Sequence, residues 1–130
     1  MADAEDLDLS REVDARAQEV ASYLKRKDKL GALVASLQNP PVTTKDSSIK
    51  DKNSAAVEQV LAVVGDNDVA ALVGGLDMDS CDTLMKYLYK IMGRVDKGIN
   101  YAILLKLHAA VSEKAGVGCV LRSLTDRKQV

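Results

Sequence analysis

The side chains best able to do chemistry are His108, Cys81 and Cys119, the single histidine and the two cysteines of the sequence. A general base at His108 would need a nucleophile and an orienting carboxylate beside it. Cys119 stands near the start of a predicted helix, where the helix dipole lowers a thiol pKa, so a thiol-dependent enzyme is one hypothesis. The alternative is that His108 and Cys119 are structural residues of an apolar core. We favour this alternative.

The spacing of these residues does not indicate a metal or cofactor site. Cys81 and Cys119 form no C-x-x-C pair, and with His108 they offer only three ligands. Residues 77–82 (DMDSCD) resemble the start of a calcium loop but lack its glycine at position six, and no glutamate follows at position twelve. Residues 116–118 (GVG) lack the third glycine and the preceding strand of a dinucleotide loop. We expect no enzymatic activity, no metal and no cofactor.

The charge balance argues against two classes of partner. The sequence has 18 Lys and Arg against 19 Asp and Glu, so no cationic field attracts nucleic acid or anionic lipid. It has no Phe, no Trp and only 4 Tyr, which leaves little to stack on bases. We find neither a membrane-spanning apolar stretch nor a signal peptide. We therefore expect a cytoplasmic protein with reduced thiols that binds neither nucleic acid nor membrane.

The apolar residues favour helices. Leucine and alanine, both strong helix formers, occur 16 times each. Their spacing, interrupted by glycine and proline, predicts six to seven short helices and no strand. The predicted segments are residues 11–29, 30–37, 54–64, 69–73, 79–92, 99–115 and 117–124, with Asp79 capping the fifth. We expect an all-α single domain in which successive helix pairs stack into an α-α superhelix.

Two segments are expected to lie outside the helices. Residues 1–10 carry four acidic side chains and no basic one, which predicts a flexible N-terminal tail before a domain of residues 11–130. Residues 39–53 are mostly polar and include both prolines, which predicts a linker within the domain.

One predicted helix is unusually apolar for a protein of this size. In residues 102–111 (AILLKLHAAV) only Lys106 and His108 are polar. Such a helix is either enclosed by its neighbours or presents an apolar face to a partner. The second possibility favours a protein that functions in a complex. The runner-up is a free-standing helical adaptor that binds peptides or regulatory proteins.

Residues 84–90 (LMKYLYK) resemble the central motif of subunit 5 of the actin-related protein 2/3 complex, the smallest subunit of that assembly. Further segments resemble the family in the same order. Upstream are residues 31–33 (GAL) and 39–41 (NPP), and downstream are residues 107–108 (LH), 113–114 (EK), 115–122 (AGVGCVLR) and 124–130 (LTDRKQV). Together they cover about residues 24–130. Gln129 departs from the family, which usually has threonine there, and residues 1–23 match only in their acidic character.

The resemblance implies a non-catalytic structural subunit of an assembly that nucleates branched actin filaments at the cytoplasmic actin cytoskeleton. It implies binding to subunit 4 and to the β-propeller subunit 1. It also implies that the N-terminal arm helps to tether actin-related protein 2. Contact with actin filaments would be indirect, through the complex.

The matched blocks also supply candidate contact residues. Tyr87 and Leu88 are expected in the core, because helical spacing separates them from Tyr89, which could face a partner. The candidate partner-contact or family-motif positions are Asn39, Pro40, Pro41, Lys86, Tyr89, Lys90, Arg122, Arg127 and Lys128.

Overall fold

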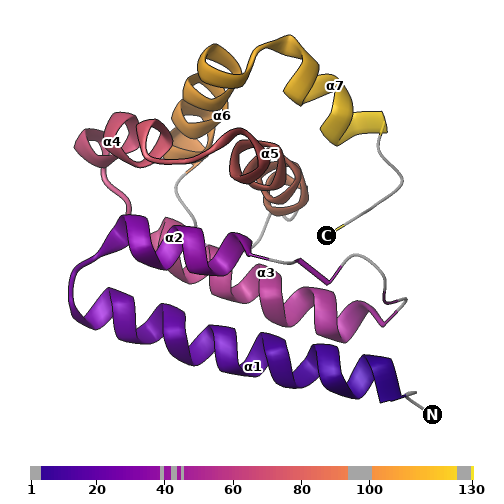
Figure 1. Ribbon diagram of the computed structural model, residues 1–130. Coiled ribbons are helices and arrows are strands. Elements are labelled where there is room, and N and C mark those ends of the chain that lie inside the picture. The colour runs from indigo at the N-terminus through magenta and orange to yellow at the C-terminus, as the bar shows by residue number, and fades with distance from the viewer. Residues whose placement is uncertain (1–3, 39, 42–43, 45, 94–100, 126–129) are drawn as a thin grey trace.

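The computed structural model of the chain describes residues 4–38, 40–41, 44, 46–93, 101–125 and 130, and over these residues it contains helices and no strand (Figure 1). The elements are α1 (Ala4–Lys25), α2 (Lys29–Leu37), α3 (Ser47–Ala62), the 3-10 turn η1 (Asp66–Asp68), α4 (Val69–Gly74), α5 (Met78–Met92), α6 (Tyr101–Ala115) and α7 (Val117–Thr125). The predicted all-α class is confirmed.

The helices form two layers that share one core (Figure 1). In the first layer α1, α2 and α3 pack against one another, and in the second α4 and α5 pack on α6 while α7 packs on α5 and α6. Helix α5 also contacts α2 and α3, so it is the helix of the second layer that packs most on the first.

The core is aliphatic apart from one aromatic ring. Tyr87 and Leu88 on α5 are both 0% exposed, as their helical spacing predicted. The largest fully buried aliphatic side chains come from both layers and include Leu33, Leu61, Leu84, Met85, Ile91, Leu104 and Leu107. Tight packing of this kind fixes the directions in which the outer faces of the helices point.

Helix α1 begins earlier than the sequence predicted. It starts at Ala4, so residues 4–10 are helical where we expected a flexible tail. Two contacts support this first part of the helix: Thr44 Oγ1 donates to Asp6 Oδ1 at 2.6 Å, and Lys52 Nζ donates to Ser10 Oγ at 3.3 Å. Acidic side chains are also favourable at a helix N-terminus, because they complement the positive end of its dipole.

Helix α3 also begins earlier, inside the expected linker of residues 39–53. Asp46 is its N-cap and accepts a hydrogen bond from the amide of Ser48 at 2.9 Å. Ile49 and Asn53 stand four residues apart and are both buried, so the polar segment has one inward face. Residues 47–53 are therefore helical, and the predicted start at residue 54 was wrong.

The second layer follows the predicted boundaries closely. Helix α5 ends before Gly93, and α6 ends before Gly116, whose φ of 82° is readily available only to glycine. The cap of α5 differs by two residues: Asp77, not Asp79, accepts from the Ser80 amide, at 2.7 Å. The predicted start of α6 falls within residues 94–100, outside the described residues.

Candidate protein-interaction site

His108 on α6 has a structural partner on α5. Its Nε2 lies 2.8 Å from the hydroxyl of Tyr89 on α5, and the two rings meet edge to face with centroids 5.4 Å apart. Tyr89, for which the sequence left a contact with a partner open, is half-buried in this contact between two helices. The pair holds α5 against α6 and offers no activated nucleophile.

The cysteines are buried and unreactive as nucleophiles. Cys81 and Cys119 are both 0% exposed, and the thiol of Cys119 donates to the carbonyl of Cys81 at 3.7 Å. Burial raises the pKa of Cys81, and it raises the pKa of Cys119 to about 12. Desolvation is the largest cause and the hydrogen bond with Asp82 adds to it, so the activated thiol that the thiol-enzyme hypothesis required is not found at Cys119.

The acidic residues that resembled a calcium loop serve the fold instead. Asp77 caps α5, and Asp82 receives two hydrogen bonds from Arg122 on α7, at 2.8 and 3.1 Å. No group of three His, Cys, Asp or Glu side chains in the described part of the chain could hold a metal ion. Among the described helices, none combines the length and the apolar character that crossing a membrane requires.

The basic residues of the matched blocks are engaged within the chain where the structure describes them. Lys90 on α5 donates to the carbonyl of Val130 at 3.1 Å and lies 3.5 Å from Asp51. Arg122 joins α7 to α5 through Asp82, and Lys86 is half-buried on α5.

The remaining candidate positions divide into two groups. Pro40 is half-buried and Pro41 is buried, so both pack into the protein beyond the end of α2. Asn39, Arg127 and Lys128 lie outside the described residues.

A buried polar network connects the two layers. Arg16 on α1 is 8% exposed and donates from Nη1 to Asn53 Oδ1 on α3 at 2.8 Å. Asn53 in turn donates from Nδ2 to the Tyr87 hydroxyl on α5 and, at 3.3 Å, to the carbonyl of Ser36 on α2. Burial lowers the pKa of Arg16 and raises that of Tyr87 to about 12. The network fixes the relative positions of four helices.

Of the large apolar side chains that are exposed among the described residues, four lie on α6 and α7, and the others are Leu7, Val63 and Met78. Leu105 is 60% exposed and Tyr101 is 41% exposed, one turn apart on α6. Leu121 and Leu124 on α7 are 56% and 62% exposed, and they share one face of that helix. We call these four residues, which lie on two helices that pack against each other, the C-terminal apolar face. Sequence reasoning identified the apolar excess of residues 102–111 but did not single out Leu121 and Leu124.

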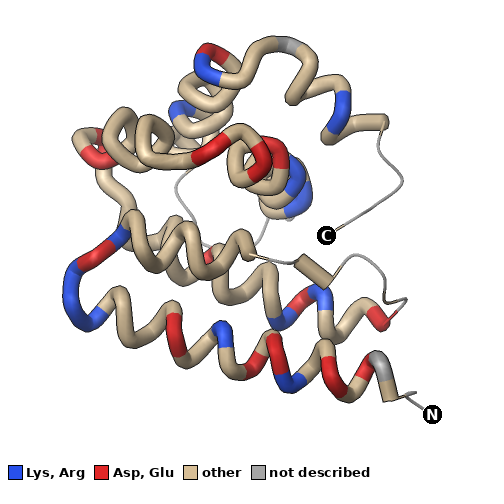
Figure 2. Tube along the Cα trace, in the orientation of Figure 1, with Lys and Arg blue, Asp and Glu red and all other residues tan. Residues whose placement is uncertain are grey.

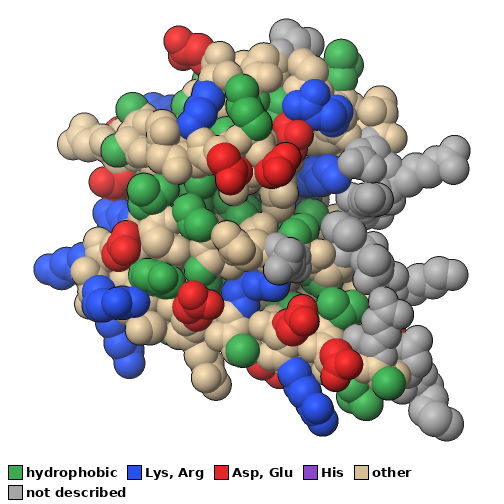
Figure 3. Space-filling model, viewed as in Figure 1, with side chains coloured by type: hydrophobic (Ala, Val, Ile, Leu, Met, Phe, Trp, Pro, Cys, Tyr) green, Lys and Arg blue, Asp and Glu red, His purple; other side chains and the backbone are tan. Residues whose placement is uncertain are grey.

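Charged side chains are distributed differently. Figure 2 shows Lys and Arg gathered at the turn between α1 and α2, whereas both signs alternate along α1. On the face drawn in Figure 3, acidic and basic side chains are interspersed, with hydrophobic side chains visible between them. Neither view shows a surface of one sign large enough to attract a polyanion.

Comparison with known proteins gives a consistent result. The sequence profile of the ARP2/3 complex 16 kDa subunit (p16-Arc) matches residues 2–130. Actin-related protein 2/3 complex subunit 5-C of Xenopus laevis is 40% identical over 112 residues, which are 86% of this chain and 74% of the relative. Subunit 5 of Dictyostelium discoideum is 34% identical over 125 residues, 96% of this chain and 88% of the relative. Subunit 5A of Arabidopsis thaliana is 33% identical over 114 residues, 88% of this chain and 84% of the relative.

Proposed function

The chain belongs to the family of the ARP2/3 complex 16 kDa subunit (p16-Arc), and from this premise we propose that it works as a structural subunit within that complex. The family is structural and non-catalytic. In this role the chain supports the nucleation of branched actin filaments at the cytoplasmic actin cytoskeleton. It binds subunit 4 and the β-propeller subunit and helps to tether actin-related protein 2.

The observation that carries this proposal is the C-terminal apolar face. Burying a leucine side chain stabilises a complex by about 1.5–3 kcal/mol, and three leucines of this face are more than half exposed. Aromatic and aliphatic side chains at the centre of a patch are typical anchors of stable interfaces. We therefore assign the contact with subunit 4 or the β-propeller subunit to α6 and α7.

The tethering role is assigned to the other end of the molecule. Leu7 on α1 is 51% exposed, in a helix whose first turns carry several carboxylates. An exposed leucine within an acidic segment suits a contact with actin-related protein 2 that combines apolar burial with charge.

The function is tested by adding charge to the C-terminal apolar face. In cells that depend on this chain, either the tagged wild-type chain or the tagged double variant Leu121→Asp, Leu124→Asp is the only copy expressed. The complex is then recovered through the tag. We expect the tagged wild-type chain to recover two actin-related proteins and a propeller protein. The variant should bind more than about 100-fold more weakly, because two leucine burials are lost.

The matched control is Gln59→Asp, Ala62→Asp, which places two charges three residues apart on an exposed part of α3. It should recover the complex like the wild type. Circular dichroism should show both variants as helical as the parent, since all four positions are exposed. Recovery of the wild-type chain alone, or with unrelated peptides, would instead favour a free-standing adaptor.

A further inference from the structure

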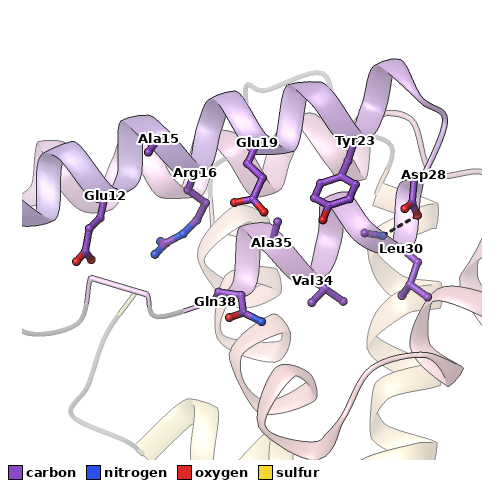
Figure 4. Close-up of a pocket in the computed structure, with 11 residues that line it drawn as sticks. Glu12, Ala15, Arg16, Glu19, Tyr23, Asp28, Leu30, Val34, Ala35 and Gln38 are labelled. Carbon is purple, nitrogen blue, oxygen red and sulfur yellow. Dashed lines mark hydrogen bonds between the residues drawn. The ribbon is translucent and has the colours of Figure 1, made fainter.

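An open groove lies between α1 and α2, on the layer away from the C-terminal apolar face (Figures 1 and 4). Its volume is about 740 Å³. Figure 4 shows Glu12, Arg16 and Glu19 reaching from α1 toward α2. The α2 side is formed by Val34, Ala35 and Gln38 among others.

The shape of the groove follows from small side chains on both helices. Ala15 and Ala35 leave space between them, and Val34 adds an apolar edge. At one end the helices come close together: a Cβ on Gly31 would lie 2.8 Å from the ring of Tyr23. The α1 side extends from Glu12 to Tyr23, twelve residues with a rise of about 16 Å. This length accommodates about three turns of a further helix.

The lining of the groove is acidic, and the basic turn between α1 and α2 borders it at one end, where Arg26 lies 4.7 Å from the centre of the Tyr23 ring. The lining carries the carboxylates of Glu12, Glu19 and Asp28 against the single guanidinium of Arg16, a net charge of −2. Asp28 already caps α2, accepting from the Gly31 amide at 2.9 Å. Glu12 and Glu19 form no ion pair with any residue that the structure describes.

Other aspartates of the chain are paired. Asp66 lies 2.8 Å from Lys106, Asp68 lies 2.7 Å from Lys29, and Asp82 lies 2.8 Å from Arg122. Lys and Arg thus neutralise these carboxylates, whereas Glu12 and Glu19, one turn to either side of Arg16 on α1, share the Coulomb attraction of that one guanidinium, which already donates to Asn53. A cationic ligand with apolar contact area is the complement of such a surface.

We propose that this groove is a second docking site, which binds a short basic helix from another subunit of the complex. The inference rests on the proposed function, because it takes the ligand from the same assembly. Small residues of the bound helix face Ala15 and Ala35, as in other contacts where one helix lies in the groove of two. Its Lys or Arg side chains reach Glu12 and Glu19, which set its orientation more than its affinity.

The experiment is site-specific photo-crosslinking in the assembled complex. Photoreactive benzoylphenylalanine replaces Ala15, which is exposed in the groove, and in a control chain it replaces Gln59, which is exposed on α3. We expect the probe at Ala15 to label one segment of another subunit, a segment that contains more Lys and Arg than Asp and Glu. The probe at Gln59 should not label that segment.

Charge variants then test the role of the glutamates. With the probe at Ala15, Glu12→Gln, Glu19→Gln should lower the yield of this crosslink about fivefold, and Glu12→Lys, Glu19→Lys should lower it further. These variants change only exposed positions, so the helical content should stay constant.

The outcomes separate the two proposals. If the chain assembles but Ala15 labels no other subunit, or labels a segment without a basic excess, the groove proposal is overturned and the subunit role stands. An unchanged yield in the lysine variant also overturns it. If the chain does not assemble with the complex, both proposals fail.

Discussion

At the scale of single residues, Asn53 is the side chain on which the contact between the layers depends most. It accepts from Arg16 and donates to Tyr87 and to the Ser36 carbonyl, all inside the protein. Buried polar groups of this kind are costly to leave unpaired, since their interaction with water has already been given up. A single substitution at this position affects α1, α2, α3 and α5.

We expect Asn53→Leu to lower the free energy of unfolding by about 3 kcal/mol, because the Arg16 guanidinium and the Tyr87 hydroxyl each lose a partner. Tyr87→Phe, which removes only the hydroxyl, should cost about 1 kcal/mol. Urea denaturation of both variants and of their combination measures the coupling. Strictly additive costs would show that Asn53 and Tyr87 do not act together.

The sequence predicted the apolar members of this region and missed the polar one. The burial of Tyr87 and Leu88 followed from helical spacing around residues 84–92. Asn53 was placed in a linker because its neighbours are polar, although Ile49, Asn53, Val57 and Val60 lie on one face of a helix. The helical spacing of these residues was present in the sequence, but the polar composition of residues 39–53 indicated a linker instead of a helix.

At the scale of elements, hydrogen bonds from Lys114 hold α6 against the end of α4. Its Nζ donates to the carbonyls of Val73, at 2.8 Å, Gly74, at 3.1 Å, and Leu76. The last carbonyls of a helix have no partner within the helix, and a cation there also complements the dipole. One side chain therefore both caps the short helix α4 and docks it on α6.

Lys114→Met should lower the free energy of unfolding by about 2 kcal/mol, because hydrogen bonds to a charged donor are lost at three carbonyls. The matched control is Lys106→Met on the same helix, whose partner Asp66 is exposed. Breaking that surface ion pair should cost less than about 1 kcal/mol. Equal costs for the two variants in urea titrations would contradict the role assigned to Lys114.

The ends of helices were predictable where glycine or proline interrupts the chain. They were not predictable where a side-chain hydrogen bond determines the first residue of the helix. Gly93 and Gly116 ended α5 and α6 as expected. The starts of α1 and α3 were placed too late, since hydrogen bonds from Thr44 to Asp6 and within the Asp46 cap support them. Such contacts depend on the tertiary structure or on a single aspartate among several.

At the scale of the whole molecule, acid should weaken the fold through its aspartates. The hydrogen bond from Lys29 holds the pKa of Asp68 below its ordinary value of 3.8, and the amide and hydroxyl of Ser48 do the same for the pKa of Asp46. A lowered pKa means that the folded state binds the proton less well than the unfolded state. This contribution to stability is present above about pH 4 and is lost as the pH falls through the lowered value.

We expect Asp68→Asn to unfold at a lower temperature than the wild type at pH 7, and the difference should shrink as acid protonates Asp68 itself below its lowered pKa. Thermal unfolding followed by circular dichroism between pH 7 and pH 2 measures both curves. Glu113→Gln serves as control, because Glu113 is exposed and forms no ion pair with the described residues. A constant difference at every pH would show that the charge of Asp68 does not stabilise the fold.

Which surfaces remain for partners could not be predicted from the sequence. Residues 102–111 were recognisably too apolar, but whether Leu105 or Leu104 faces outward depends on how α4 and α5 pack on α6. The groove between α1 and α2 forms only where the two helices pack together. Along the sequence, the charged residues of these helices have the spacing of an ordinary solvent-exposed helix face. Both surfaces are properties of the packed molecule.

The position of α5 has a consequence for how the molecule comes apart. Because α5 packs on α2 and α3 as well as on α6 and α7, the layers cannot separate without exposing its buried side to water. A partial opening would bring buried side chains of α5, Tyr87 and Leu88 among them, into contact with water. We therefore expect a partner bound to either layer to slow the proteolysis of the other.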